Sequence, residues 1–153
     1  MALYLVQHGK SLPKEADPEQ GLSEQGQAEV QRIAAVAADY QIRVFEILHS
    51  VKKRARQTAE IFATALKPTR GCSERSGLKP MDDITEIAAT LNSPDNVMLV
   101  GHLPFMEKLT AYLVTGTTDN RVFKFQNGGI VCLDKDAEQR VWFIKWTLMP
   151  DIS

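Results

Sequence analysis

The sequence predicts an α/β fold, a three-layer α/β/α arrangement with a mostly parallel central sheet and an antiparallel C-terminal part. The first observation is that apolar runs and amphipathic segments with helical spacing alternate over the first two thirds of the chain. The second is that extended segments follow one another after Gly116 with no helical pattern between them. No repeat, low-complexity segment or linker divides the 153 residues, so we expect a single domain over 1–153.

Three apolar runs predict the strands of the parallel part. They are rich in β-branched and aromatic residues, and a glycine, Gly9 or Gly101, closely follows two of them. The predicted strands are Ala2–Gln7, Val44–His49 and Val97–Val100. The segment from Pro68 to Pro80 is loop-like, with room for one weak edge strand.

Four segments with apolar residues three or four apart predict helices that cover both faces of this sheet. Ser23 is a good N-cap for the first helix, Pro68 ends the second, and Pro104 suits the first turn of the last. The predicted helices run from the Ser23 cap to about Tyr40, over Lys53–Leu66, over Asp82–Leu91, and from Pro104 to about Val114.

The C-terminal part predicts strands that pair partly in the antiparallel direction. The extended segments are Val122–Phe125, Gly129–Leu133 and Val141–Leu148. Strict alternation in the last segment places Trp142, Ile144 and Trp146 on one face of the strand.

The composition is that of an ordinary globular protein, with 44% hydrophobic residues, 24% charged residues and a net charge of −1. This charge gives no reason to expect nucleic acid or a membrane surface as a partner, and no apolar run could span a bilayer. The first residues lack the features of a signal peptide. We expect a cytoplasmic monomer in which Cys72 and Cys132 are buried, reduced thiols.

Two of the predicted strands end in a histidine beside a glycine, in Gln7-His8-Gly9 and in Gly101-His102. Ligands of open parallel sheets bind outside the carboxyl ends of the strands, so both imidazoles are expected to face one crevice. A single histidine at such a position is more often part of a turn or a core. Two of them, each beside a glycine that allows close approach of the backbone, indicate a functional site.

The third predicted strand leads into a basic segment at the start of a helix. Cations there oppose the helix dipole, so they make sense when they recruit an anion that the free N–H groups also favour. We interpret Lys52, Lys53 and Arg56 as a solvated basic face. Arg54 is expected to turn toward the crevice and grip a phosphate in a bidentate manner.

With these motifs, the chain resembles the histidine phosphatase superfamily, which includes phosphoglycerate mutases and acid phosphatases. Its short length and spacing most resemble the SixA-type phosphohistidine phosphatases. Four motifs in the family's order carry the resemblance, namely QHG at 7–9, LSEQG at 22–26, SVKKRARQTA at 50–59 and GHLP at 101–104. The resemblance implies a phosphoglycerate mutase-like fold and covers nearly the whole chain.

The resemblance also implies a role for each motif residue. His8 would attack phosphorus and form a phosphohistidine that water then hydrolyses, while Arg54 and His102 would hold the phosphoryl oxygens, with Gly9 also in the phosphate pocket. The family mechanism implies no metal and no other cofactor, hence a metal-independent phosphatase. Zinc binding by His8 and His102 would need a third ligand, and His49 is the only other histidine.

A general acid to protonate the leaving group is expected at Asp82 or Asp83, where the family places an acidic residue. Our choice is Asp83, although either carboxylate could instead cap the short helix that follows. For phosphohistidine the leaving nitrogen protonates easily, so a weak acid would suffice.

The chain departs from the family at Gln7, where the family has arginine. The absence of this guanidinium removes a charge and a bidentate donor from the phosphate pocket. Gln7 can still donate one hydrogen bond through its amide, and the flexible ammonium of Lys10 can restore some charge. Val51 also replaces the family's usual proline. Two interpretations follow, an active but altered phosphatase, which we favour, or a phosphate-binding module with little turnover.

The spans between the motifs are short and leave little chain to build a lid over the pocket. An open pocket suits a phosphohistidine side chain on another protein better than a small molecule. A small phosphomonoester, such as a sugar or nucleotide phosphate, is the alternative substrate.

Overall fold

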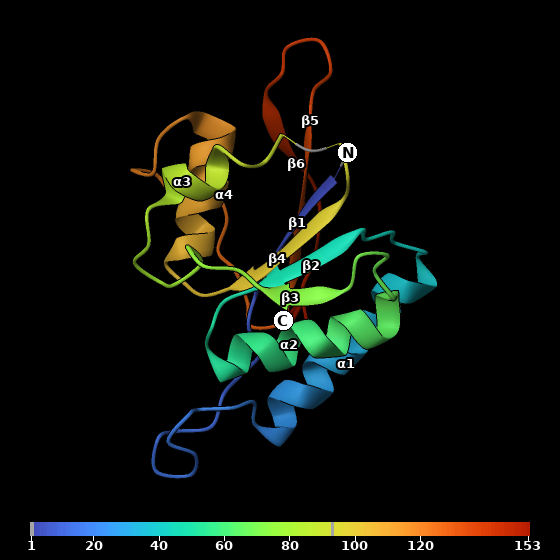
Figure 1. Ribbon diagram of the computed structural model, residues 1–153, viewed down its shortest axis with the longest axis vertical. Coiled ribbons are helices and arrows are strands. Elements are labelled where there is room, and N and C mark those ends of the chain that lie inside the picture. Colours follow the sequence, from blue (N-terminus) through green and yellow to red (C-terminus); the bar gives the residue numbers. More distant parts are fainter. Residues whose placement is uncertain (1, 93) are drawn as a thin grey trace.

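A computed structural model describes residues 2–92 and 94–153 of the chain. Its strands form one six-stranded sheet in the order β3-β2-β4-β1-β5-β6 (Figure 1). The strands are β1 (Ala2–Gln7), β2 (Glu46–His49), β3 (Cys72–Glu74), β4 (Val97–Gly101), β5 (Ile130–Lys135) and β6 (Trp142–Leu148). Neighbours from β3 to β1 pair in parallel, whereas β5 and β6 pair in the antiparallel direction. The predicted fold class is confirmed.

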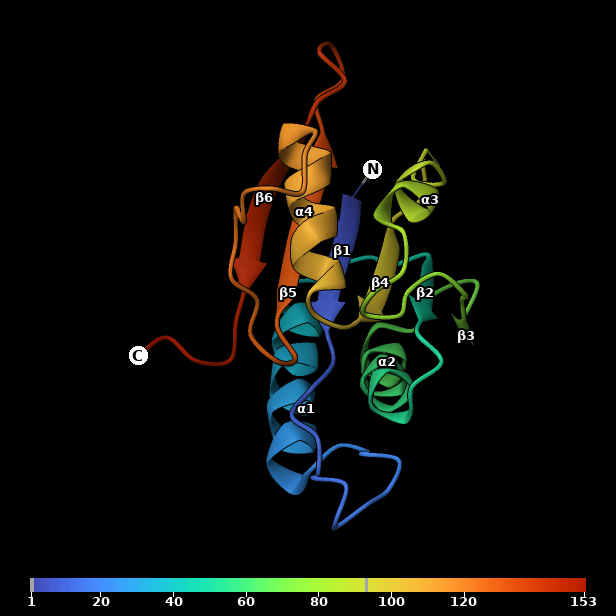
Figure 2. The same cartoon turned by 90° about the vertical axis from the view of Figure 1, so that its left-hand side faces the viewer.

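Helices cover both faces of the sheet (Figure 2). The helices α1 (Glu24–Asp39) and α2 (Lys53–Leu66) share one apolar core with the sheet, and α3 (Ile84–Ala88) and α4 (Phe105–Thr115) share the other. Side chains alternate between these cores along β1, where Tyr4 and Val6 face α1 and α2 while Leu3 and Leu5 face the other pair. The three predicted layers therefore arise from strands that are apolar on both faces.

Local signals in the sequence explain the ends of the first two helices. Ser23 caps α1, as predicted, because its side-chain oxygen accepts a hydrogen bond from the backbone N–H of Gly26 at 3.0 Å. The helix α2 ends at Lys67 in a left-handed conformation, directly before Pro68. At Gly26 any Cβ would collide with the carbonyl oxygen of Lys10, so α1 and the loop after β1 can approach this closely only with glycine there.

The structure shortens two predicted elements and removes a third. The strand β2 begins two residues later than predicted. The helix α3 covers only Ile84–Ala88, because Thr90 and Leu91 after it donate their backbone hydrogen bonds three residues back, as in a 3₁₀ turn. The predicted strand Val122–Phe125 is wrong. The backbone N–H of Phe125 donates to the Glu107 carboxylate on α4 at 3.0 Å instead of to a strand, so this segment lies as a loop.

The predicted alternation along β6 is also wrong at one residue. The pairing of β5 with β6 shifts between Cys132 and Leu133, which leaves Lys145 as an extra residue on β6. Trp142 and Ile144 consequently pack with α3 and α4, while Trp146 packs on the opposite face with α1 and α2. A bulge of one residue exchanges the faces of all side chains beyond it.

The two cysteines are free thiols, but only one is fully buried. Cys132 lies in the core, whereas Cys72 is half-buried because β3 is the edge strand of the sheet. Burial raises the pKa of both thiols to about 11. Across the described ranges, no helix is long and apolar enough to cross a membrane.

Candidate active site

The carboxyl ends of adjacent parallel strands bring two of the predicted site residues together. His8 follows β1 and His102 follows β4, and these strands are neighbours. The centroids of the two imidazole rings lie 5.2 Å apart, with the ring planes tilted by 58°. The backbone N–H of His8 donates to the carbonyl oxygen of Gly101 at 2.9 Å and ties the two loops to each other. The two histidines expected in one crevice therefore lie side by side.

The orientation of the His8 ring is set by its own loop. Its Nδ1 lies 2.7 Å from the carbonyl oxygen of Gly9. Because a carbonyl can only accept, the ring proton sits on Nδ1, and in the neutral ring the lone pair is on Nε2. The side-chain amide of Asn127 donates to the His8 carbonyl at 3.0 Å and holds the backbone on the other side. This geometry suits a ring that attacks through Nε2.

Helix α2 fixes the loop that carries His8. The backbone N–H of Gly9 donates to the Thr58 hydroxyl oxygen at 2.9 Å, and this hydroxyl donates to the carbonyl oxygen of Arg54 at 2.8 Å. A Cβ at Gly9 would lie 2.7 Å from a methyl group of Val30, so a larger residue would push the loop away from α1. Gly9, Thr58 and Arg54 thus form one connected support.

His102 is held differently, in a buried position with 1% of its surface exposed. Its Nε2 lies 2.8 Å from the hydroxyl oxygen of Ser50, the residue after β2. Its Nδ1 is buried and has no hydrogen-bond partner among the described residues. If the Ser50 hydroxyl donates to Nε2, the ring proton sits on Nδ1, which is then a buried N–H donor without a partner in the described ranges.

Both rings are held in the neutral form. Burial lowers the pKa of His8, partly opposed by its bond to Gly9, and the charge of Arg54 lowers it further. Burial lowers the pKa of His102 to about 3, with further contributions from His8, Arg54 and Lys52. A neutral His8 keeps its lone pair at neutral pH, as a nucleophile requires.

Arg54 lies in the first turn of α2 and is the positive charge that acts on both rings. It is half-buried, and within 2–92 and 94–153 its side chain forms no ion pair. The rest of the basic segment behaves otherwise. Arg56 lies 3.8 Å from Glu60, and Lys52 is exposed. Lys53 does not belong to a solvated face as predicted, because it binds Asp17 at 2.9 Å.

The two residues expected to compensate for the missing arginine differ in their surroundings. The Oε1 atom of Gln7 is buried and has no hydrogen-bond partner in the described part of the chain. The ammonium of Lys10 lies 3.6 Å from the Glu29 carboxylate on α1, so its charge already has a partner. The structure thus leaves Arg54 as the guanidinium of the site.

The candidate general acid, Asp83, serves as the N-cap of α3. Its carboxylate accepts hydrogen bonds from the backbone N–H and the hydroxyl of Thr85, at 2.9 and 2.7 Å. These bonds lower the pKa of Asp83, which keeps it ionised and unsuited to donating a proton. Asp82 accepts a hydrogen bond from the backbone N–H of Lys79. Both aspartates line an open hollow of about 720 Å³ that reaches Ser50.

Sequence reasoning missed three supporting residues. Ser50 and Thr58 lie inside the motif at 50–59, but their contacts with His102 and Gly9 cross between elements. Asn127 lies in a loop far along the chain, and no local signal marks it.

His49, the third histidine, is buried and donates from Nδ1 to the carbonyl oxygen of Ser50. Over the ranges that the structure describes, no group of three or more His, Cys, Asp or Glu residues could hold a metal ion.

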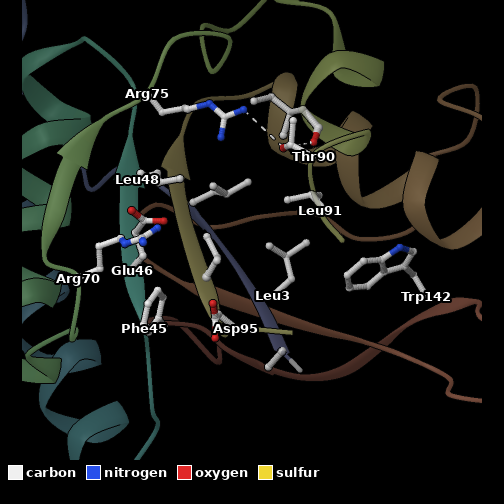
Figure 3. Close-up of a pocket in the computed structure, with 14 residues that line it drawn as sticks. Leu3, Phe45, Glu46, Leu48, Arg70, Arg75, Thr90, Leu91, Asp95 and Trp142 are labelled. Atoms are coloured by element: carbon white, nitrogen blue, oxygen red, sulfur yellow. Dashed lines mark hydrogen bonds between the residues drawn. The ribbon is translucent and has the colours of Figure 1, made fainter. Parts of the chain in front are cut away.

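A second cavity, of about 160 Å³, lies at the other end of the parallel strands (Figure 3). It is lined by Leu3 near the start of β1, Leu48 of β2, Leu91 after α3 and Trp142 of β6, with Arg75 bound to Thr90 at its rim. None of the predicted site residues lines it. The chemistry indicated by the motifs is therefore at the opposite, carboxyl end of the sheet.

Comparisons with known proteins identify the class of protein. The sequence model of the histidine phosphatase superfamily (branch 1) matches residues 3–82, just over half of the chain. The chain therefore belongs to the histidine phosphatase superfamily, to which phosphatase hydrolases belong. No curated protein sequence matches the chain.

Solved structures share the fold over the full length of the chain. The protein histidine phosphatase SixA in complex with tungstate is 23% identical, with a TM-score of 0.86 over 98% of this chain and 97% of that one. A structure assigned to the phosphohistidine phosphatase SixA of Agrobacterium tumefaciens is 28% identical, with a TM-score of 0.78 over 97% of each chain. One assigned to an α-ribazole-5′-phosphate phosphatase of Escherichia coli is 15% identical, with a TM-score of 0.78 over 100% of this chain and 99% of that one. The fold is accordingly phosphoglycerate mutase-like.

Proposed function

We propose that the protein is a phosphatase that uses His8 as its nucleophile and acts on phosphohistidine of a protein substrate. The observation that carries this proposal is the arrangement of His8, whose Nδ1 is bound to Gly9 while its Nε2 has no hydrogen-bond partner among residues 2–92 and 94–153. Arg54, which has no counterion within the described ranges, acts on the same ring.

The reaction would proceed in two displacements at phosphorus. The Nε2 lone pair of His8 forms a bond to phosphorus as the bond from phosphorus to the leaving nitrogen breaks, and that nitrogen takes up a proton from solvent. Water then attacks the phosphorus on His8 as the bond from phosphorus to Nε2 breaks. One hydrogen of the water stays on the released phosphate, the other proton goes to solvent, and the ring of His8 is neutral again. Arg54 and the unpaired Nδ1–H of His102 would bind the equatorial oxygens and stabilise their charge. These steps need neither a metal nor another cofactor.

The leaving group decides whether a general acid is required. An imidazole nitrogen protonates easily, so the transfer can proceed with Asp83 engaged as a helix cap. An alkoxide leaving group from a phosphomonoester would need such an acid far more. The engagement of Asp83 as a helix cap therefore supports phosphohistidine over a phosphomonoester, with Asp82 as the other candidate acid.

The direct test is phosphate release from a phosphohistidine peptide by the purified protein. We expect turnover by the natural chain and a loss on the order of 10⁴ or more in the His8→Ala variant, since the nucleophile is gone. Arg54→Ala should lose on the order of 10²–10³. Arg56→Ala is its matched control, because Arg56 lies on the same helix but pairs with Glu60. Equal rates for the natural chain and His8→Ala would contradict the proposal.

Two alternatives are separated in the same assay. Faster turnover of a sugar or nucleotide phosphate than of the peptide would indicate a small-molecule phosphomonoesterase, the activity stated for the α-ribazole-5′-phosphate relative. Binding of phosphate without turnover of any substrate would indicate a phosphate-binding module, the interpretation that Gln7 keeps open.

A further inference from the structure

The loop of residues 126–129, which leads into β5, rests against the loop that carries His8. The side-chain amide of Asn127 donates to the His8 carbonyl oxygen at 3.0 Å, and the backbone N–H of Gly128 donates to the carbonyl oxygen of Gln7 at 2.8 Å. Two glycines follow Asn127, and glycine leaves a backbone more conformational freedom than any other residue. The position of Asn127 therefore depends on the contacts that the rest of its loop makes.

The segment 149–151, which leaves β6, holds this loop at Gln126. The side-chain Nε2 of Gln126 donates to the carbonyl oxygen of Asp151, and its Oε1 accepts from the backbone N–H of Asp151, both at 2.9 Å. The loop and the segment lie at the same end of β5 and β6, where the outermost backbone pair is Ile130 with Leu148 (Figure 2). Gln126 thus exchanges two hydrogen bonds with one residue, as a residue of a paired strand does, and its orientation is fixed.

Two further interactions hold this segment near the site. Arg32 of α1 donates to the carbonyl oxygen of Pro150 at 2.7 Å. Hydrogen bonds from Ser153 lower the pKa of Asp151, and the positive charge of Lys10 in the loop after β1 lowers it further. The segment is therefore tied to α1 and lies within electrostatic reach of the loop after β1.

On these contacts, and building on the proposed function, we propose that Gln126 is a positioning residue for the nucleophile. Its pairing with Asp151 holds Asn127, and Asn127 holds the backbone of His8 where Nε2 can attack phosphorus in line. Such a role matters to the rate because a misplacement of about 1 Å can lower a rate on the order of 10²-fold. In the described part of the chain no hydrogen bond joins Gln126 to His8, so its effect passes through Asn127.

Steady-state kinetics of the full chain on a phosphohistidine peptide test this role. Gln126→Met has a similar shape but cannot pair with Asp151, so we expect kcat to fall about tenfold while KM stays within about twofold. Rapid quenching should show that phosphohistidine forms on His8 more slowly by the same factor. Gln139→Met is the matched control, because Gln139 is an exposed glutamine between β5 and β6, and it should behave as the natural chain does.

A double-mutant cycle shows whether the effect passes through Asn127. Asn127→Ala removes the hydrogen bond to the His8 carbonyl, so adding Gln126→Met to it should lower kcat by a further factor of about two or less. If Gln126 only stabilised the fold, Gln126→Met would cost the same factor in both backgrounds. Circular dichroism shows that each variant is folded.

The ring of His8 reports the same effect without any catalysis. Burial lowers the pKa of His8 in the natural chain. A loop released by Gln126→Met exposes the ring to more water, so NMR titration should give a pKa of His8 that is higher by about half a unit. Asn127→Ala should shift it in the same direction, and Gln139→Met should leave it unchanged.

The proposal is overturned if Gln126→Met keeps the natural kcat and the natural pKa of His8, or if it costs about tenfold with and without Asn127. Failure of the proposed function looks different. The natural chain then turns over no substrate, while the pKa of His8 still moves in Gln126→Met and Asn127→Ala. That result would retain the positioning of His8 and remove only its role as the nucleophile.

Discussion

His8 and His102 stand at equivalent places, each after a parallel strand and beside a glycine, yet the fold treats them in opposite ways. His8 is partly exposed and binds its own loop through Nδ1, and its Nε2 has no hydrogen-bond partner within the described ranges. His102 is buried and binds Ser50 of the neighbouring loop through Nε2. Similar local sequence thus yields one ring suited to attack and one suited to positioning, because His8 is bound by the next residue of its own loop whereas His102 is bound by a residue from another strand end.

The largest effect on turnover that distinguishes the roles of His8 and His102 is expected from His102→Gln. This change should reduce turnover of a phosphohistidine peptide on the order of 10²–10³, because one donor to the phosphoryl oxygens is lost. The phosphohistidine on His8 should still form. Mass spectrometry of protein that is quenched rapidly and without acid would detect it. A variant that forms no such adduct would mean that His102 also takes part in the attack.

A smaller loss is expected from Ser50→Ala, which removes the hydroxyl next to Nε2 of His102. Freed from this bond, the ring can place its proton on either nitrogen, so we expect about a tenfold lower kcat with little change in KM. Ser50→Thr retains a hydroxyl and should recover part of the rate. Equal rates for Ser50→Ala and the natural chain would show that the bond does not orient the ring.

The buried position of His102 should also appear in the pH dependence of stability. Its pKa is about 3 in the folded protein and 6.5 in the unfolded chain. Between these values the unfolded state binds a proton that the folded state does not, so the free energy of unfolding falls as the pH falls from 6.5 toward 3. One ring contributes at most about 1.4 kcal/mol per pH unit. Urea unfolding of His102→Gln should show a correspondingly shallower slope, and identical slopes would contradict this account.

The smallest effect concerns Asp83, which lies outside the pair of rings. Asp83→Ala should lower the free energy of unfolding by about 0.5–2 kcal/mol, because the cap of α3 is lost. Asp83→Asn keeps a capping oxygen and should be nearly as stable as the natural chain. Turnover of the phosphohistidine peptide should stay within about twofold in Asp83→Asn. If Asp83→Asn lost about 10²-fold or more in turnover, the loss expected when a general acid is removed, Asp83 would again be the general acid.

The sequence predicted the parallel part of the fold better than the rest because its signals there are local. The Ser23 cap, Pro68 and the apolar run of β1 each depend on residues a few positions apart. The strand Val122–Phe125 failed because a side chain of α4 takes the hydrogen bond that a neighbouring strand would need. The face of Trp146 failed because a bulge at Lys145 depends on the pairing of two strands.

By itself the sequence determined the α/β fold class, the family and the four motifs that carry His8, Arg54 and His102, because periodicity and spacing are written along the chain. Only the tertiary structure decided that Ser50 holds His102 and that Asn127 holds His8, since these contacts join residues more than 50 positions apart. It also decided that Lys10 pairs with Glu29, and that Oε1 of Gln7 is buried without a hydrogen-bond partner in the described part of the chain. Hydrogen bonding and burial are properties of neighbours in space, and they set the chemistry that each motif residue can perform.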